Sequence, residues 1–359
     1  MTITFLVGNG FDIAAGLNTS YSGFYEWYKD QQPRTENENE AIKAFKKEID
    51  DYMSIKDPEA RKKSRWADFE VGLGKYTAKF TKDTAEDFIE LYEDVHEGII
   101  TYLENERKKY EAPLSDSEVT ERFRQGIRDF YGELNSAERD AISQLLQNDQ
   151  KHDTEIKFVS FNYTDCLDVC INEVSQRPLS AWQYGGIKTM EVASSVLHAH
   201  GTIDHYPVLG VFDETQIENQ DLLKHPGFTE IMIKAQSVRA MGEHWYRETE
   251  KTISQSTIVC VWGMSLGATD AYWWKTIITW LKENSSRHLI IFWHTKNPPN
   301  QRSILRYVRE KQDVVARLTS YSALSEEEIR NIQDRIHIVF NTERVLQISF
   351  SKKTEKITL

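Results

Sequence analysis

Short apolar runs alternate with amphipathic stretches along much of this 359-residue chain. Continuous apolar runs rich in β-branched residues are typical of buried strands, whereas apolar residues three or four apart are typical of helices. The pattern predicts strands at 2–7, 156–161, 195–202, 207–212, 257–262, 288–293 and 336–340, with an edge strand at 345–350. Strands that alternate with helices indicate an α/β fold with a mostly parallel, doubly wound, Rossmann-like sheet.

One long part of the chain has no strand-like runs. Between residues 33 and 155 charged residues dominate, and apolar residues recur at helical spacing, as in Phe88, Leu91 and Val95. We therefore expect a large helical insertion at 33–155 in an α/β nucleotide-binding domain formed by 1–32 and 156–359. Further helices are expected at 13–30, 166–174, about 230–255, from about 270 to 283, about 300–318 and 325–334.

Composition narrows the classes of function. A net charge of −12 and a pI near 5.4 give no strong nucleic-acid signal, since non-specific binding to nucleic acids needs a basic surface. The three cysteines, Cys166, Cys170 and Cys260, are too few for a disulfide framework and fit a reducing compartment. With no apolar stretch as long as a membrane span and no basic region before the first apolar run, we expect a cytoplasmic protein without a membrane partner.

Four predicted strands end in glycine or polar residues. These ends are Gly8–Asp12, Asn162–Asp165, His200–Gly201 and Gly263–Ser265. The carboxyl ends of parallel strands lie along one edge of a sheet, where open α/β sheets bind their ligands. Glycine lets the backbone turn sharply and approach a ligand closely. Together these ends predict a nucleotide cleft.

Several polar residues have structural interpretations beside functional ones. Asp12 can cap the helix that follows it or face a ligand, and Thr164 or Asp165 can cap the helix at 166–174. Glu70 could reach a site, although a solvated or capping carboxylate is the favoured interpretation. His198 and the histidine two residues later share one face of a strand. They could ligate a metal, but no partner ligand is evident, and His198 is better interpreted as a hydrogen-bonded strand residue.

Other enzyme classes fit less well. Position 13 is Ile where the dinucleotide fingerprint has its third glycine, which disfavours a hydride-transfer dehydrogenase. The chain has no Walker A pattern. The segment Gly263–Gly267 has the G-x-S-x-G spacing of a nucleophile elbow, and with His294 or His337 it could imitate an α/β-hydrolase. Such a hydrolase has no need of the polar residues at the Asn162 and His200 strand ends.

Taken together, several short motifs resemble the bacteriophage abortive-infection AbiH family. The resemblance runs from the first strand to beyond residue 270. The motifs that carry it are Gly8-Asn9-Gly10-Phe11-Asp12, Gly16-Leu17-Asn18-Thr19-Ser20-Tyr21, Ser160-Phe161-Asn162-Tyr163-Thr164-Asp165, His198-Ala199-His200-Gly201 and Gly263-Met264-Ser265-Leu266 with Asp270. That family in turn is remotely similar to sirtuin-like NAD-binding domains, which show such motifs in the same order.

The resemblance implies roles for individual residues. Asn162 takes the place of the asparagine that orients water and ribose, and His200 takes the place of the catalytic base. The implied nucleotide-binding residues are Gly8, Asn9, Gly10, Phe11, Asp12, Asp165, Gly201, Gly263, Ser265, Leu266 and Asp270. The chain departs from sirtuins in having Asn9 where they usually have alanine, and in having no paired C-x-x-C zinc module. A sirtuin-like NAD hydrolase of phage defence is therefore a better analogy than a protein deacylase.

The expected function is that of an antiphage abortive-infection effector, or toxin, that hydrolyses NAD⁺ to nicotinamide and ADP-ribose. NAD⁺ is then the substrate, and neither a cofactor nor a metal is expected. The residue types suit the reaction, because cleavage forms an oxocarbenium-like centre and needs orientation and a base more than an acid. A nucleotide-sensing module that binds NAD⁺ without cleaving it and a nuclease stay as alternatives. A phage-derived trigger and a second copy of the chain are further expected partners.

Overall fold

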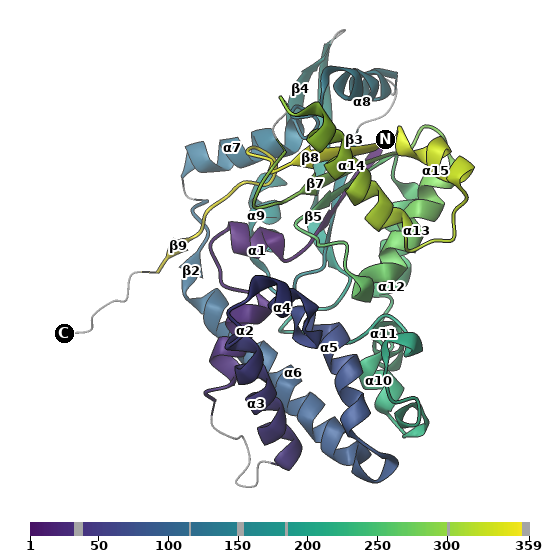
Figure 1. Ribbon diagram of the computed structural model, residues 1–359. Coiled ribbons are helices and arrows are strands. Elements are labelled where there is room, and N and C mark those ends of the chain that lie inside the picture. The colour runs from purple at the N-terminus through teal and green to yellow at the C-terminus, as the bar shows by residue number, and fades with distance from the viewer. Residues whose placement is uncertain (32–38, 115, 149–153, 184–185, 300–301, 354–359) are drawn as a thin grey trace, which may run out of the picture. The chain divides into compact units, whose positions relative to one another are not determined.

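The computed structural model describes residues 1–31, 39–114, 116–148, 154–183, 186–299 and 302–353 (Figure 1). Contacts divide the chain into two compact units. The first comprises Met1–Gly16, Tyr110–Ala199 and Arg247–Leu359, and the second comprises Leu17–Lys109 and His200–Tyr246. These limits differ from an insertion at 33–155, because 110–155 groups with the sheet. The expected boundary at residue 33 and the start of the helix expected at about 300 lie outside the described residues.

The first unit holds the sheet. Its elements are β1 (Thr2–Val7), α1 (Gly10–Ala14), β2 (Tyr110–Glu111), α7 (Ser117–Arg128), α8 (Ser136–Asn148), β3 (Thr154–Ser160), α9 (Cys166–Val174), β4 (Leu179–Gln183), β5 (Gly186–His198), most of α12 (Trp245–Gln255), β6 (Ile258–Trp262), α13 (Ala271–Glu283), β7 (His288–Trp293), α14 (Ile304–Thr319), α15 (Glu326–Gln333), β8 (Ile336–Phe340) and β9 (Ser351–Lys352).

Seven described strands form one sheet in the order β4-β5-β3-β1-β6-β7-β8. Only β4 and β5 pair antiparallel among these strands; every other neighbouring pair is parallel, which confirms the α/β class and the mostly parallel sheet. The strand order reverses at β1, since the chain moves outward to β3 and β5 and then returns to β6 on the other side. The carboxyl ends of β1 and β6 therefore flank the point where open α/β sheets bind ligands.

β1 lies in the middle of the sheet, and its residues from Ile3 to Val7 are buried on both faces. The ring of Phe5 stacks on Phe158 of β3, with centroids 5.1 Å apart, and meets Phe130 edge-on at 6.0 Å. α9 packs against β5, and α7 packs against both α9 and β4. The cysteines of α9, Cys166 and Cys170, are buried as expected for small core residues.

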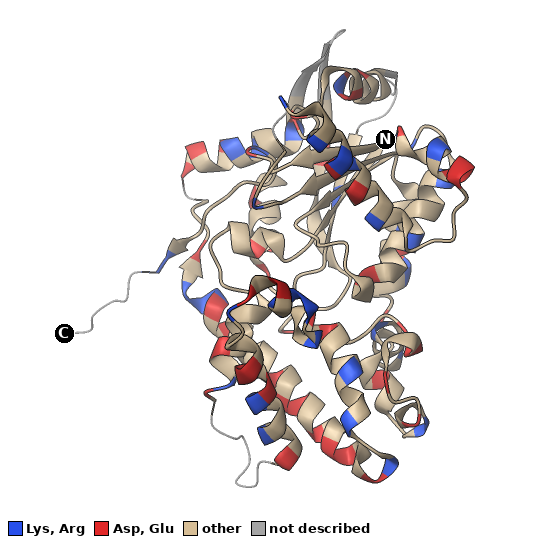
Figure 2. Cartoon of the chain, viewed as in Figure 1, with Lys and Arg blue, Asp and Glu red and all other residues tan. Residues whose placement is uncertain are grey.

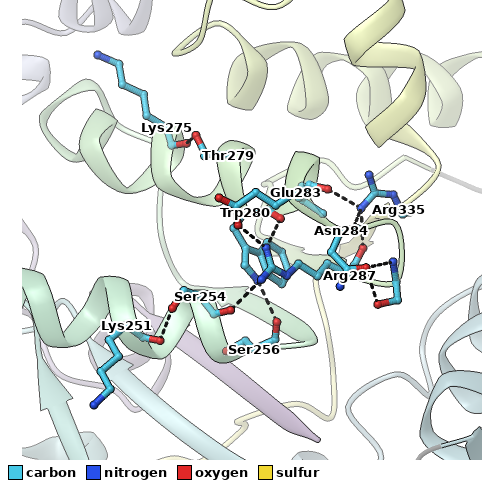
Figure 3. A network of polar contacts seen from close by, with 12 residues as sticks. Lys251, Ser254, Ser256, Lys275, Thr279, Trp280, Glu283, Asn284, Arg287 and Arg335 are labelled. Atoms are coloured by element: carbon cyan, nitrogen blue, oxygen red, sulfur yellow. Dashed lines mark hydrogen bonds and ion pairs between the residues drawn. The ribbon is translucent and has the colours of Figure 1, made fainter.

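Two arginines hold the ends of α12 and α13 (Figure 3). Arg287 donates through Nη2 to the carbonyl oxygen of Ser254 at 2.9 Å. Arg335 donates through Nη1 to the carbonyl oxygens of Leu281 at 2.8 Å and Asn284 at 2.9 Å. The last carbonyls of a helix lack partners within the helix, so these guanidinium groups fasten both helices beside the amino ends of β7 and β8.

Two strand predictions fail where the backbone leaves the extended region. The strand predicted at 195–202 begins earlier and ends at His198, because the chain turns at Gly201, whose φ is +69°. The expectation that His198 and His200 share a strand face is therefore wrong. The segment 207–212 forms only a bridge from Val211 to Ile233, beside Gly210 with φ +153°.

Two further predictions of local structure are also wrong. The segment 345–350 forms no strand in the described chain, and Leu346 has a φ of +53°; the short β9 that follows pairs with β2. The helix expected at 230–255 is three helices, α10 (Phe228–Met232), α11 (Lys234–Ala240) and α12. Gly242, with a φ of +74°, ends the second of them. Local sequence periodicity does not show these left-handed turns.

The second unit is helical. Its main elements are α2 (Tyr21–Tyr28), α3 (Glu40–Met53), α4 (Pro58–Lys63), α5 (Phe69–Tyr76), α6 (Ala85–Lys108), α10 and α11. Aromatic side chains form its core, with Phe24 stacked on Tyr28 at 5.1 Å and meeting Phe69 edge-on at 5.8 Å. Acidic residues recur along α6 (Figure 2). Within the described residues, no helix combines the length and apolar character that crossing a membrane requires.

Candidate functional site

The turns that follow β1 and β6 pack backbone against backbone. Gly8 donates its N–H to the carbonyl oxygen of Trp262 at 2.8 Å, and Gly10 donates to that of Gly263 at 2.9 Å. A Cβ on Gly10 would lie 2.5 Å from the Cα of Gly263, and one on Gly8 would lie 2.7 Å from the Gly263 carbonyl oxygen. The close packing of the two turns therefore requires glycine at these positions, whether or not a ligand approaches them.

The loop after β6 is held by side chains from α14 and the segment that follows it. The carbonyl oxygen of Leu266 accepts a hydrogen bond from Arg317 Nε at 3.2 Å and one from the Tyr321 hydroxyl at 2.8 Å. Leu266 itself is buried and has a φ of +49°, whereas Ser265 is exposed. The strained residue is thus Leu266, and the side chain offered to solvent at this turn is Ser265.

The histidines proposed for a hydrolase triad have other surroundings. His337 is buried, and its Nε2 lies 2.9 Å from His288 Nδ1, while its Nδ1 lies 3.7 Å from a carboxylate oxygen of Glu138. Burial, together with the charge of His337 and Arg335, lowers the pKa of His288 to about 4. His294 is exposed. The interactions of His337 are those of a buried polar pair between β7 and β8, so they give the nucleophile-elbow interpretation no support.

On the other side of β1, side chains meet. Asp12 lies in the first turn of α1 and is almost fully buried. Its Oδ1 accepts from Asn162 Nδ2 at 3.1 Å, and its Oδ2 accepts from the Thr164 hydroxyl at 2.6 Å. Asp12 therefore holds the loop after β3, whereas the sequence predicted either a helix cap or a ligand-facing group. The N-cap position of α1 is Asn9, which makes no side-chain capping bond.

Asn162 is fixed by three hydrogen bonds. Besides the bond from its amide nitrogen to Asp12, its backbone N–H donates to Ser160 Oγ at 3.1 Å, and its carbonyl oxygen accepts from His198 Nδ1 at 3.2 Å. Asn162 is buried, with an exposed fraction of 3 %. Its Oδ1 has no hydrogen-bond partner in the part of the chain that the structure describes. A buried amide oxygen without a partner marks a place for a donor from a ligand or water.

His198, the last residue of β5, links this cluster to α9. Its Nε2 lies 3.1 and 3.0 Å from the two carboxylate oxygens of Asp168. The sequence interpretation of His198 as a hydrogen-bonded strand residue is confirmed. Asp168 was missed, although its position in the first turn of a helix that begins at a polar strand end is a usable signal. We call Asp12, Asn162, Thr164, His198 and Asp168 the β3-end cluster.

The remaining predicted residues of the first unit contribute differently. Phe11 is fully buried, and its ring meets Trp262 at 6.0 Å and Phe123 at 6.4 Å, so it packs in the core. Asn9 and Asp165 are exposed. Asp165 stands at the N-cap position of α9 without a side-chain capping bond, and the Thr164 hydroxyl is used on Asp12, so neither caps this helix. Asp270 is partly buried just before α13.

His200 and Gly201 belong to the second unit. His200 is buried, its carbonyl oxygen accepts from Val208 N–H at 2.8 Å, and its ring centroid lies 6.4 Å from that of Tyr246. A Cβ on Gly201 would lie 2.3 Å from the carbonyl oxygen of Tyr206, which explains this glycine by a tight turn. The predicted base and the predicted Asn162 are thus parts of different compact units.

Glu70 is neither solvated nor a cap. In the second unit its Oε2 lies 2.9 Å from Lys234 Nζ, with both side chains buried, and its Oε1 accepts from Gly210 N–H at 3.4 Å. Removal of either partner of such a pair destabilises the fold, because it leaves an uncompensated buried charge. Glu70 therefore links α5 to α11 and to the turn at Gly210.

Neither a metal-binding group of side chains nor the cavity beside α7 coincides with the β3-end cluster in the described chain. Over the described ranges, no three His, Cys, Asp or Glu side chains are grouped as a metal site would need. A cavity of about 780 Å³ is lined by α7 and by the segment 343–351, with Arg122, Asp129, Glu343 and Arg344 among its lining residues. None of its lining residues belongs to the β3-end cluster. The candidate site therefore rests on its hydrogen bonds and burial.

Comparison with known proteins identifies one family. The model of the family described as "Bacteriophage abortive infection AbiH" matches residues 4–292. The matched range contains the turns after β1, β3 and β6 and every residue of the β3-end cluster. No curated protein matches the chain.

Proposed function

This chain belongs to the bacteriophage abortive-infection AbiH family, and from that premise we propose that it is a defence effector that hydrolyses NAD⁺ to nicotinamide and ADP-ribose. Membership of the family gives a role in phage abortive infection. The reaction is our own proposal, and it rests on the order of the strands, the β3-end cluster and the similarity of the motifs to sirtuin-like domains.

The strand order supports a dinucleotide as ligand. Numbered along the chain, the six parallel strands β5, β3, β1, β6, β7 and β8 have the order 3-2-1-4-5-6. This is the order of Rossmann folds, which bind dinucleotides across the crevice where the order reverses. Here the reversal lies at β1, whose carboxyl end leads directly to Asp12. A fold alone does not give a function, so the side chains at that end carry the argument.

The single observation that carries the proposal is the buried Oδ1 of Asn162 without a partner among the described residues. An ionised Asp12 carboxylate only accepts hydrogen bonds, so it fixes the Asn162 amide with Nδ2 toward itself and leaves Oδ1 for another donor. A ribose hydroxyl, a nicotinamide N–H or an attacking water each offers such a donor. Asn162 thereby orients the groups that NAD⁺ hydrolysis must align.

Hydrolysis of NAD⁺ needs little acid catalysis from the protein. Nicotinamide leaves as a neutral molecule when its bond to the ribose breaks, and the ribose carbon takes on oxocarbenium character until water adds to it. The water loses one proton, and we propose His200 as the base that accepts it. That role comes from the similarity of the His200 motif to sirtuin-like domains.

The proposal is tested by incubating the purified full chain with NAD⁺, alone and with lysate from phage-infected cells, and by measuring nicotinamide release. We expect Asn162→Ala and His200→Ala to lower the rate by roughly 100-fold or more. Asn172→Ala and His294→Ala, at exposed positions, serve as matched controls and should keep the wild-type rate. The proposal fails if wild-type protein releases no nicotinamide in either arm, or if Asn162→Ala has the wild-type rate.

A second candidate is a sensor that binds NAD⁺ without cleaving it. The observation that favours it is that the ionisable side chains of the β3-end cluster are engaged with one another, Asp12 with Asn162 and Thr164, and Asp168 with His198. Such groups hold a binding site more readily than they transfer protons. Thermal stabilisation by NAD⁺ that is lost in Asn162→Ala, with no nicotinamide released, would establish the sensor instead of the hydrolase.

A further inference from the structure

The hydrogen bonds around His198 assign it a role in the proposed site. We infer that His198 and Asp168 are positioning residues that fix the Asn162 backbone and so aim Asn162 Oδ1 at the ligand. The inference rests on the proposed function, because it concerns the same amide oxygen. It adds a part of the site for which the sequence motifs gave no role, since they pointed to His200.

The donors and acceptors around His198 can be assigned from chemistry alone. Nδ1 faces the carbonyl oxygen of Asn162 at 3.2 Å, and Nε2 faces the Asp168 carboxylate at 3.1 and 3.0 Å. A carbonyl and an ionised carboxylate only accept hydrogen bonds, so each ring nitrogen faces an acceptor. The ring of His198 is therefore held on two sides, by the loop after β3 and by α9.

This arrangement leaves the side-chain oxygen of Asn162 open to a ligand. Ser160 Oγ takes its backbone N–H, His198 holds its carbonyl oxygen and Asp12 takes its side-chain nitrogen. Among the described residues Oδ1 has no partner, and that atom is buried. The peptide plane is held by His198 and the amide plane by Asp12, so a ligand meets an acceptor whose direction is already set. Preorganisation of this kind removes the cost of ordering the side chain when the ligand binds.

Asp168 acts on Asn162 only through His198. Its carboxylate lies on the first turn of α9, eight residues after Ser160 along the chain, and bridges the helix to the end of β5. The side chain of His198 is 13 % exposed and that of Asp168 is 36 % exposed. A pair exposed to this degree adds little to stability by itself, since solvent screens it. Its effect should therefore appear in the alignment of Asn162 more than in the free energy of unfolding.

A double-mutant cycle, with the rate of nicotinamide release as readout, tests whether Asp168 acts on Asn162 through His198. We expect His198→Ala to lower kcat by about 30-fold and Asp168→Ala by about 10-fold, as misalignment of one group would. The double variant should be no slower than His198→Ala, because Asp168 acts through the ring. Asp168→Asn keeps an acceptor oxygen for Nε2–H and should recover kcat to within about 3-fold of the wild type. Melting temperatures should change little in all four variants.

The matched control is the other histidine–carboxylate pair, His225 and Glu86 of the second unit, whose Nε2 and Oε1 lie 3.2 Å apart. His225→Ala and Glu86→Ala remove the same kind of ion pair and should keep the wild-type kcat. If Asp168→Ala and His198→Ala lower kcat additively, or if Asp168→Asn is as slow as Asp168→Ala, the positioning role is wrong. Wild-type kcat in His198→Ala also overturns it and leaves the proposed function standing.

An NMR measurement tests the positioning of Asn162 independently of NAD⁺ hydrolysis. In ¹⁵N-asparagine-labelled protein, the Asn162 side-chain signal is the one that disappears in Asn162→Ala. We expect it to shift in His198→Ala and to return toward its wild-type position in Asp168→Asn. If wild-type protein neither binds nor consumes NAD⁺, the proposed function is lost. In that case an Asn162 signal unchanged by His198→Ala overturns the inference as well, whereas a shifted signal upholds the positioning of Asn162.

Discussion

The two sides of β1 are joined to their neighbours in opposite ways. Toward β6, Gly10 meets backbone atoms of Gly263, and Gly8 meets Gly263 and the side chain of Met264, with no room for a Cβ at either glycine. Toward β3, the buried carboxylate of Asp12 accepts side-chain hydrogen bonds from Asn162 and Thr164, which are also buried. Both sides belong to one turn of the chain, yet one consists of the smallest residues and the other of polar ones.

The two sides of β1 thus have different roles, one in positioning the turn and the other in contacting a ligand. The close approach of Gly10 to Gly263 fixes where α1 begins, because Gly10 is the first residue of that helix. Asp12 follows two residues later, so the same approach sets where its carboxylate points. The glycine side therefore positions the turn, and the polar side presents an atom to a ligand. A glycine-rich turn in a sequence indicates the first property and carries no information on the second.

The strongest test of the glycine side is Gly10→Ala. The new Cβ would lie 2.5 Å from the Cα of Gly263, and backbone atoms cannot rotate away as a side chain can. We expect a loss of roughly 4 kcal/mol in the free energy of unfolding, or failure to fold, as for other severe overpacking. Denaturant unfolding measures the loss, and reduced yield of soluble protein is the second readout.

Gly267→Ala is the matched control for that substitution. A Cβ at this position in the loop after β6 would lie 3.3 Å from the hydroxyl oxygen of Ser265, a side chain that can move. Its unfolding free energy should fall by less than about 1 kcal/mol. Equal losses in Gly10→Ala and Gly267→Ala would show that backbone packing is not what distinguishes the β6 side.

The polar side is tested by Asp12→Ala. Removal of this carboxylate leaves the Asn162 amide and the Thr164 hydroxyl buried without their acceptor. We expect the free energy of unfolding to fall by about 3 kcal/mol, since each unmet buried donor carries its own penalty. Asp313→Ala, at an exposed position on α14, is the control and should change it by less than about 0.5 kcal/mol. A similar small change in Asp12→Ala would contradict the role given to this carboxylate.

Much of the fold could be predicted from the sequence. The strands β7 and β8 have the predicted bounds, and so does the helix α9, because each is a local pattern of apolar residues. The predictions failed where a single left-handed residue decides the path, as at Gly201, Gly210 and Leu346. Such turns depend on contacts distant in sequence, for example that of Gly210 with the Met232 carbonyl, where a Cβ would lie 2.4 Å from the oxygen.

The candidate site was predicted in part. The sequence placed Asp12 and Asn162 at the carboxyl ends of two strands of one parallel sheet, and the structure shows that these strands are neighbours. It could not show that they bind each other, nor that Thr164 turns toward Asp12 instead of capping α9. Asp168 escaped notice because one carboxylate on a helix resembles any solvated residue until its partner is known. The hydrogen bonds that define the cluster join residues up to 152 positions apart.

The smallest of these effects is expected for Thr164→Val, which removes one hydroxyl from the polar side and keeps the shape of the side chain. Asp12 Oδ2 then loses the 2.6 Å bond that Thr164 donates, while Oδ1 keeps its bond from Asn162. We expect a loss of about 1.5 kcal/mol in denaturant unfolding, near the value for one hydrogen bond to a charged group. Thr164→Ser retains the hydroxyl and should recover most of that loss. If Thr164→Ser is as unstable as Thr164→Val, the methyl group rather than the hydrogen bond stabilises this side of β1, and the contrast with the glycine side rests on Asn162 alone.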